Sequence, residues 1–197
     1  MNIRTRDITA VILAGGQGRR MGGRDKGLIE FNGKPLVSIL IDKLEQQSVD
    51  IIINANRNQQ RYQESGYPVI TDQLADYQGP LAGFASAMDS VTTDFIVTLP
   101  CDSPLLVADY VARFVTSYGQ TNAPVHVAFD GDRLQPVHAL IRVDLLPDLL
   151  EFLDSGDRKI DRWYALHDFV QTDFSDCADM FRNINTPSDQ QSLQDQQ

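Results

Sequence analysis

The chain has 197 residues, of which 42% are hydrophobic and 22% are charged, and this composition predicts a single domain, residues 1–197, with an ordinary apolar core. The formal net charge of −10 argues against general nucleic-acid binding, which needs a broad basic face. No run of 18 apolar residues is present to span a membrane, and two cysteines without a CxxC pair predict a reducing cytoplasm as the location.

Strands and helices alternate along the first half of the sequence. Short apolar runs rich in β-branched residues predict buried strands over 8–13, 50–54, 68–71 and 94–99. A short extended piece over 28–31 precedes an Asn32-Gly33 turn. Apolar residues at helical spacing predict helices over 35–47, 59–65, 81–91 and 107–118. This alternation predicts an α/β fold, a Rossmann-like three-layer α/β/α sandwich with a mostly parallel sheet.

The last third of the sequence is less regular. Extended runs over 125–129 and 137–141 flank Asp130-Gly131-Asp132 and predict a hairpin. Helices are expected over 144–153 and 159–167, and a strand is expected over 169–174. The polar tail, residues 191–197, is expected to fray.

Residues 13–27, LAGGQGRRMGGRDKG, form a glycine-rich basic loop that holds six of the thirteen glycines and four of the seventeen basic residues. A loop that follows the first strand lies at the carboxyl end of the sheet, where α/β proteins bind ligands. Glycine lets the backbone approach phosphate oxygens, and Arg19, Arg20, Arg24 and Lys26 add charge-assisted hydrogen bonds. Neither GxxxxGK[ST] nor GxGxxG is complete, so the loop predicts a polyphosphate site of another kind. A glycine-rich turn with a solvated basic edge is the alternative.

Polar residues end the next three predicted strands, and parallel strands bring their carboxyl ends to one edge. Asn54 can bond a ribose hydroxyl or a base edge, and Asp72 can bond ribose or a metal-bound water. Asp102 can hold Mg²⁺, which takes one or two carboxylates together with phosphates and waters. Strand termination, a turn and a helix cap at Asp102 or Ser103 are the respective alternatives.

Other polar positions carry weaker signals. Gly79 opens a helix whose free N–H groups attract anions, although the following proline at the first helical position is a sufficient structural reason. The three histidines have no zinc-ligand spacing, and His126 is expected to be a strand residue. Cys101 is expected to be a small buried residue, not a nucleophile.

Six separated motifs together resemble the molybdenum cofactor guanylyltransferases, a family of nucleotidyltransferases. They span nearly the whole chain in order: LAGGQGRRMGGRDKGLIEFNGKPL at 13–36, INAN at 53–56, SGYPVITD at 65–72, DYQGPLAG at 76–83, PCDSP at 100–104 and NINTP at 183–187. Cytidylyltransferases of the same cofactor usually carry LAAG where this chain has LAGG at 13–16. One departure is DGDRLQPVHAL at 130–140, where relatives often have His-Pro and this chain has Gln135 before Pro136, which leaves the role of His138 open.

The resemblance implies transfer of GMP from GTP to molybdopterin or molybdenum-molybdopterin, with the guanine dinucleotide cofactor and pyrophosphate as products. It implies catalytic roles for Lys26, Asp102, Arg19 and Arg20, with Mg²⁺ on Asp102. The implied nucleotide-binding residues are Leu13, Ala14, Gly15, Gly16, Gly18, Lys26, Asn54, Asp72, Gly79 and Asp102. The implied acceptor-binding residues are Pro80, Leu81, Asn183 and Asn185, although Asn185-Thr186-Pro187 can also start the last helix.

The same resemblance divides the chain into a nucleotide-binding half, residues 1–104, and an acceptor-binding half, residues 105–190. Besides GTP and molybdopterin, it implies other cofactor-biosynthesis proteins or chaperones of recipient molybdoenzymes as partners. Two alternatives stay open. One is a nucleotidyltransferase that uses CTP or a sugar-phosphate acceptor, and the other is a non-enzymatic adaptor that binds nucleotide or cofactor.

Overall fold

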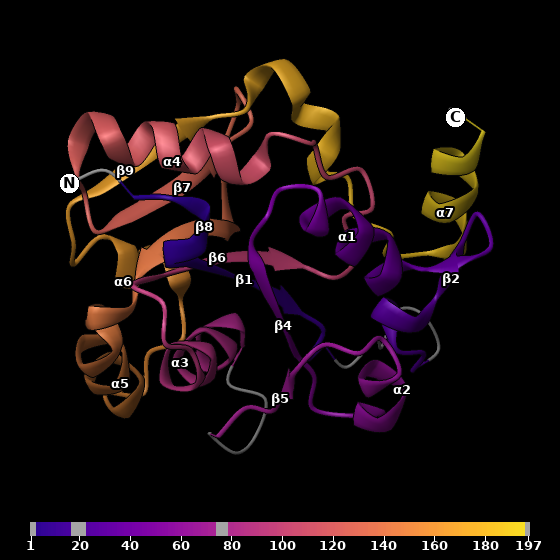
Figure 1. Cartoon of the computed structure of the whole chain (residues 1–197), viewed down its shortest axis with the longest axis horizontal. Helices are drawn as coiled ribbons and strands as arrows, with labels where there is room; N and C mark the ends of the chain where they lie inside the picture. Colours follow the sequence, from indigo (N-terminus) through magenta and orange to yellow (C-terminus); the bar gives the residue numbers. More distant parts are fainter. Residues whose placement is uncertain (1–2, 17–22, 74–78, 196–197) are drawn as a thin grey trace.

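A seven-stranded sheet forms the middle layer of the protein (Figure 1). The computed structural model describes residues 3–16, 23–73 and 79–195. In spatial order the strands are β5 (Val69–Ile70), β4 (Asp50–Asn54), β1 (Ile8–Leu13), β6 (Phe95–Pro100), β8 (Leu134–Arg142), β7 (Val125–Phe129) and β9 (Phe169–Asp173). Neighbouring strands are parallel except at β8, which is antiparallel to both β6 and β7. The mostly parallel sheet is therefore confirmed, and β7–β8 is the expected hairpin.

Helices cover both faces of this sheet. The helices are α1 (Leu36–Glu45), α2 (Gln59–Gln63), α3 (Pro80–Ser90), α4 (Tyr110–Thr121), α5 (Leu146–Asp154), α6 (Ile160–Tyr164) and α7 (Pro187–Gln194). Short 3₁₀ turns are η1 (Thr5–Asp7), η3 (Lys26–Leu28), η4 (Val143–Leu145) and η5 (Ser175–Phe181). In Figure 1, α4 lies above the sheet, and α3 and α5 lie below it.

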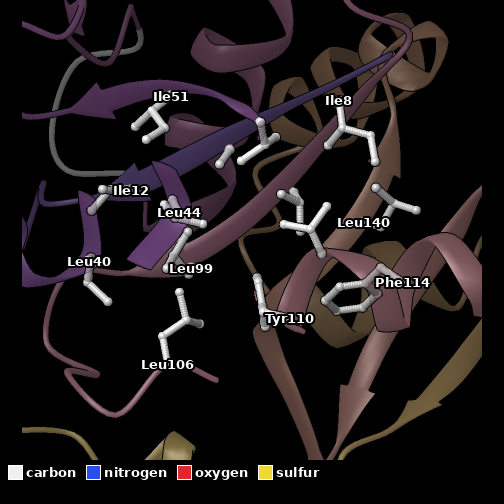
Figure 2. Packing of buried hydrophobic residues seen from close by; sticks show 14 of the residues in the cluster. Ile8, Ile12, Leu40, Leu44, Ile51, Leu99, Leu106, Tyr110, Phe114 and Leu140 are labelled. Atoms are coloured by element: carbon white, nitrogen blue, oxygen red, sulfur yellow. The ribbon is translucent and has the colours of Figure 1, made fainter. Parts of the chain in front are cut away.

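Strand β1 shows how the three layers form. Its alternate residues Ile8, Ala10 and Ile12 enter an apolar cluster with α1 and α4, part of which Figure 2 shows. The intervening Val11 and the partly buried Leu13 pack in a second cluster with α3, α5 and α6. Burying each larger apolar side chain contributes roughly 1.5–3 kcal/mol. An uninterrupted apolar strand is therefore favoured because both of its faces are covered.

The register of the parallel strands aligns their carboxyl ends. Leu13 lies opposite Asn54 on one side and Pro100 on the other, and Asn54 lies opposite Ile70. The segments that follow these residues, including the start of the glycine-rich basic loop, consequently meet at one edge of the sheet. Within the described ranges, no helix has the length and hydrophobicity needed to cross a membrane.

Several expected boundaries are wrong. Leu28 belongs to η3, and only Glu30–Phe31 forms the strand β2, which pairs with β3 (Lys34–Pro35) around the expected Asn32-Gly33 turn. Both turn residues have positive φ, 50° and 78°, as this hairpin turn requires. Helix α4 starts at Tyr110 after a run of turns. The helix-cap interpretation of Asp102 and Ser103 is therefore wrong.

The chain end differs from the expected frayed tail. Helix α7 continues through residues 191–194, and Thr186 caps its first turn by accepting a hydrogen bond from the Asp189 N–H at 3.2 Å. Leu193 is buried in a small cluster of apolar residues from η3–α1 and from the segment before α7, namely Ile29, Phe31, Leu36 and Ile184. One leucine in a polar stretch thus fixes the helix against the first third of the chain.

Candidate active site

Lys26, Asp102 and Asn185 meet at the carboxyl edge of the sheet, although they come from three distant segments. The Lys26 ammonium donates to Asp102 Oδ2 at 2.7 Å and to Asn185 Oδ1 at 2.6 Å. Asp102 follows β6, and Lys26 opens η3 at the end of the glycine-rich basic loop. The structure therefore brings together one expected phosphate-binding cation, the expected metal ligand and one expected acceptor residue.

Main-chain and side-chain bonds hold the Asn183–Asn185 segment beside Asp102. The Ile184 N–H donates to the Asp102 carbonyl at 2.9 Å, and Ser103 Oγ donates to Asn183 Oδ1 at 2.6 Å. Asn185 also lies at the start of α7, since its N–H donates to the Asp189 carboxylate at 3.0 Å. The helix-start interpretation of Asn185 is therefore confirmed, and its contact with the acceptor stays a prediction.

The second carboxylate oxygen of Asp102 is buried and has no hydrogen-bond partner in the part of the chain that the structure describes. The residue as a whole is 7% exposed. Leaving a buried charged acceptor unpaired is costly, so this oxygen favours a cation or a donor from a ligand. The described residues contain no group of three acidic, histidine or cysteine side chains placed to hold a metal ion. A divalent ion here would therefore complete its coordination with water and ligand phosphates.

A second polar group forms where β4 and β5 end. Both oxygens of Asp72 accept from amides, one from Asn54 Nδ2 at 3.0 Å and the other from Asn56 Nδ2 at 2.7 Å. The Asp72 N–H donates to Asn56 Oδ1 at 2.9 Å, which completes a reciprocal pair. Asn54 and Asp72 therefore come together as expected, whereas Asn56 has no assigned role in the sequence reasoning.

Two glycines allow these amides to lie close to neighbouring segments. A Cβ on Gly15 would come within 2.9 Å of Asn56 Nδ2, and a Cβ on Gly83 would come within 2.9 Å of Asn54 Oδ1. Contacts that short are not tolerated by real Cβ atoms. A Cβ on Gly16 would instead meet no atom of the described residues within 4 Å. Gly15 is thus needed for packing, whereas the described part of the chain leaves Gly16 uncrowded.

The remaining expected site residues fall into four groups. Leu13 and Ala14 continue β1 into the loop, since the Leu13 carbonyl accepts from the Cys101 N–H at 3.0 Å and the Ala14 N–H donates to the Asn54 carbonyl at 2.8 Å. Gly79, with φ of 78°, precedes the exposed Pro80 at the start of α3. The Leu81 side chain is buried in the core, and its expected contact with the acceptor stays a prediction. Gly18, Arg19 and Arg20 lie outside the described residues.

Burial shifts the pKa values of three other side chains. Cys101 is buried, and burial raises the pKa of its thiol well above the ordinary value, as expected for a core residue. His126 lies in β7, and burial lowers its pKa to about 4. His138 packs beside Tyr110, and burial lowers its pKa to about 3. Both imidazoles are therefore neutral near pH 7.

Comparison with known proteins decides the family. Residues 10–171 match the family model described as the MobA-like NTP transferase domain. The chain is 50% identical to the molybdenum cofactor guanylyltransferase of Shewanella loihica, over 94% of this chain and 95% of the relative. It is 49% identical to the enzyme of that name from Shewanella sediminis, with the same coverage. The chain belongs to the molybdenum cofactor guanylyltransferase family.

Solved structures agree with this fold. Molybdopterin-guanine dinucleotide biosynthesis protein A from Archaeoglobus fulgidus aligns with a TM-score of 0.77 at 20% identity, covering 95% of this chain and 97% of that one. A nucleotidyl transferase from Methanothermobacter aligns with a TM-score of 0.72 at 20% identity, covering 96% of each chain. The α/β sandwich and the nucleotidyltransferase class, both expected from the sequence, are confirmed for this member of the guanylyltransferase family.

Sequence reasoning missed the residues that support the glycine-rich basic loop in this guanylyltransferase. Asp25 is buried, and its carboxylate accepts hydrogen bonds from Asn58 and Tyr62. Arg57, which follows the INAN motif, donates to two loop carbonyls. In the sequence, Asp25 looks like a solvated charge within a basic loop, because it stands directly before Lys26. Only the packing of the α2 segment against the loop shows that Asp25 is a buried supporting residue.

Proposed function

We propose that this protein transfers GMP from GTP to the terminal phosphate of molybdopterin or molybdenum-molybdopterin, and releases pyrophosphate. The observation that carries the proposal is the pairing of Lys26 with Asp102 at the carboxyl edge of the sheet, beside the glycine-rich basic loop. This pair suits a triphosphate, because one side chain neutralises phosphate charge and the other accepts a divalent cation. The names of its close relatives support guanine as the base and the molybdenum cofactor as the acceptor.

The nucleotide would lie across the ends of β1, β4 and β6. Main-chain groups of Leu13, Ala14 and Gly15 and the amide of Asn54 would contact the base and ribose, and Asp72 would orient the two asparagine amides. Gly16, Gly18 and Gly79 would let the backbone approach the phosphates. Arg19 and Arg20 would add positive charge to the triphosphate.

The acceptor would enter from the other side of the Lys26–Asp102 pair. A cavity of about 370 Å³ opens beside Asn183 and Asn185. Gln135, the residue that departs from the family pattern, lines this cavity and donates to Asp130 Oδ2 at 2.6 Å. Arg133 and Arg182 line it too and supply cations for an acidic ligand. The exposed Pro80 at the start of α3 is a further acceptor contact in this proposal.

The proposed transfer does not depend on acid–base catalysis by protein side chains. An oxygen of the acceptor phosphate bonds to the α-phosphorus of GTP, and the bond from that phosphorus to the bridging oxygen breaks, so pyrophosphate leaves with its electron pair. The nucleophile is already an anion and needs no general base. Lys26 would offset the repulsion between the two anions and the charge that develops on the leaving group. Asn185 would hold the Lys26 ammonium at that point.

Asp102 would hold Mg²⁺ through its unpartnered oxygen, which fits a hard cation that prefers oxygen ligands. Bound there, Mg²⁺ supplies Lewis-acid polarisation of the phosphate oxygens. Lys26 pairs with the other oxygen of Asp102 at 2.7 Å. The free thiols Cys101 and Cys177 are consistent with a reducing cytoplasm as the place of the reaction.

Pyrophosphate release tests this proposal against both alternatives. Purified protein is mixed with Mg²⁺, one nucleoside triphosphate and either molybdopterin or glucose 1-phosphate. We expect pyrophosphate and a guanine dinucleotide with GTP and molybdopterin alone. Release with CTP or with the sugar phosphate would favour another nucleotidyltransferase. Tight GTP binding without pyrophosphate in any mixture would favour the adaptor.

A further inference from the structure

Asp25 lies directly before Lys26, and its side chain is held by the segment that contains α2. Its Oδ1 accepts from Tyr62 Oη at 2.5 Å, and its Oδ2 accepts from Asn58 Nδ2 at 3.0 Å. Arg57 Nε lies 3.6 Å from Asp25 Oδ2. A buried carboxylate is stable only when it is paired and hydrogen-bonded, and these three contacts meet that need. The Asp25 side chain is therefore held in one position by the segment that contains α2.

Arg57 holds the backbone of the same loop. One terminal nitrogen of its guanidinium donates to the Gly23 carbonyl at 2.8 Å, and the other donates to the Arg24 carbonyl at 2.9 Å. The planar fork of arginine suits two neighbouring acceptors, which a lysine ammonium cannot match with the same geometry. Arg57 thus fixes the two residues that lead into Asp25 and Lys26.

Tyr62 also packs against Gly27, the residue that follows Lys26. Its ring is fully buried, and a Cβ on Gly27 would come within 2.5 Å of Tyr62 Oη. The chain after Lys26 therefore lies directly against the tyrosine, a contact that needs glycine. The turn closes with the Leu28 N–H donating to the Asp25 carbonyl at 3.2 Å. Lys26 is consequently bracketed by two neighbours that both rest on Tyr62.

These contacts converge on residues 23–27, whose main chain carries Lys26, which donates to Asp102. We infer that Arg57, Asp25 and Tyr62 are positioning residues that set the direction of Lys26 toward the phosphates. The inference rests on the proposed role of Lys26 in the guanylyl transfer. A misplacement of about 1 Å in such a group can cost roughly 10²-fold in rate.

A double-mutant cycle tests this inference. Arg57→Met removes both bonds to the loop carbonyls, and we expect kcat for guanylyl transfer to fall about 10²-fold in the wild-type background. In the Lys26→Ala background the same change should cost less than about threefold, because the group that it positions is absent. Arg57→Lys keeps the charge beside Asp25 and should recover part of the rate. Arg61→Met removes the same charge from the neighbouring α2 and should change kcat less than about twofold.

All variants are assayed at a temperature where thermal unfolding curves show them folded, so loss of fold cannot imitate the effect. Equal losses from Arg57→Met in both backgrounds would overturn the inference, since they would mean that Arg57 acts independently of Lys26. A Lys26→Ala variant with wild-type activity would instead overturn the proposed function itself. The two failures are therefore distinguishable.

Discussion

Replacing Lys26 with alanine is the perturbation that probes the site most deeply. The lysine makes two short charge-assisted hydrogen bonds, at 2.7 Å to Asp102 and at 2.6 Å to Asn185. Loss of one preorganised donor from a phosphoryl-transfer site costs roughly 2–4 kcal/mol of transition-state stabilisation. That corresponds to a fall of about 30- to 900-fold in kcat/KM for GTP with molybdopterin.

The same substitution has a second consequence that does not depend on catalysis. The side chain of Asp102 is only 10% exposed, and without Lys26 neither of its oxygens has a partner among the described residues. Removing one partner of a buried ion pair costs up to about 3–5 kcal/mol, and less here because the lysine side chain is 21% exposed. Mg²⁺ added without nucleotide should then raise the melting temperature of Lys26→Ala more than that of the wild type.

The assay compares Lys26→Ala with Lys34→Ala, whose exposed ammonium pairs with Asp42 at 2.8 Å on the surface. Both variants are measured for turnover by pyrophosphate release and for melting temperature with and without Mg²⁺. The control should match the wild type within about twofold, as surface ion pairs contribute little. A change below threefold in Lys26→Ala, together with an unaltered response to Mg²⁺, would refute the assignment of Lys26 to the phosphates.

Three further predictions concern other parts of the molecule. Asp102→Asn should lower Mg²⁺-dependent turnover at least about 10²-fold, and Mg²⁺ titration curves identical to the wild type would remove Asp102 from the site. Gly27→Ala should lower the free energy of unfolding by about 1–3 kcal/mol, because its Cβ meets Tyr62, whereas Gly16→Ala should leave it within about 0.5 kcal/mol; urea unfolding that ranks the two the other way would contradict the packing argument. The pKa of His138, lowered to about 3 by burial, means that the unfolded state takes up a proton first, so stability falls as pH drops below about 6.5, by about 2 kcal/mol at pH 5. In His138→Gln this part of the pH dependence should vanish, and an unchanged slope between pH 7 and pH 5 would contradict it.

The sequence was sufficient to predict those elements whose residue pattern is typical of a single kind of secondary structure. Ile8–Leu13 and Asp50–Asn54 match the expected strands residue for residue, because uninterrupted β-branched runs suit a strand covered on both faces. Parallel strands also place Asn54, Asp72 and Asp102 at one edge, and the first two are in direct contact. These inferences needed only local pattern and the direction of the strands.

Contacts between distant segments were beyond such reasoning. The bond between Lys26 and Asn185 joins residues 159 positions apart, and it depends on the segment before α7 packing beside Asp102. The Leu81 side chain, at the start of α3, is buried in a core cluster formed with residues of distant segments. The burial of Leu193 likewise depends on a cluster formed by residues from the first third of the chain. In each case tertiary packing, which local sequence does not encode, decides the position.

The central claim is that Lys26, the loop amides and a cation on Asp102 together bind three linked phosphates. Isothermal titration calorimetry of the folded protein with GTP and Mg²⁺ tests it most directly. We expect saturable heat with GTP, weaker binding of CTP, and loss of the Mg²⁺-dependent part in Asp102→Asn. The absence of any binding heat with GTP and Mg²⁺, or heat that is identical in Asp102→Asn, would contradict the account.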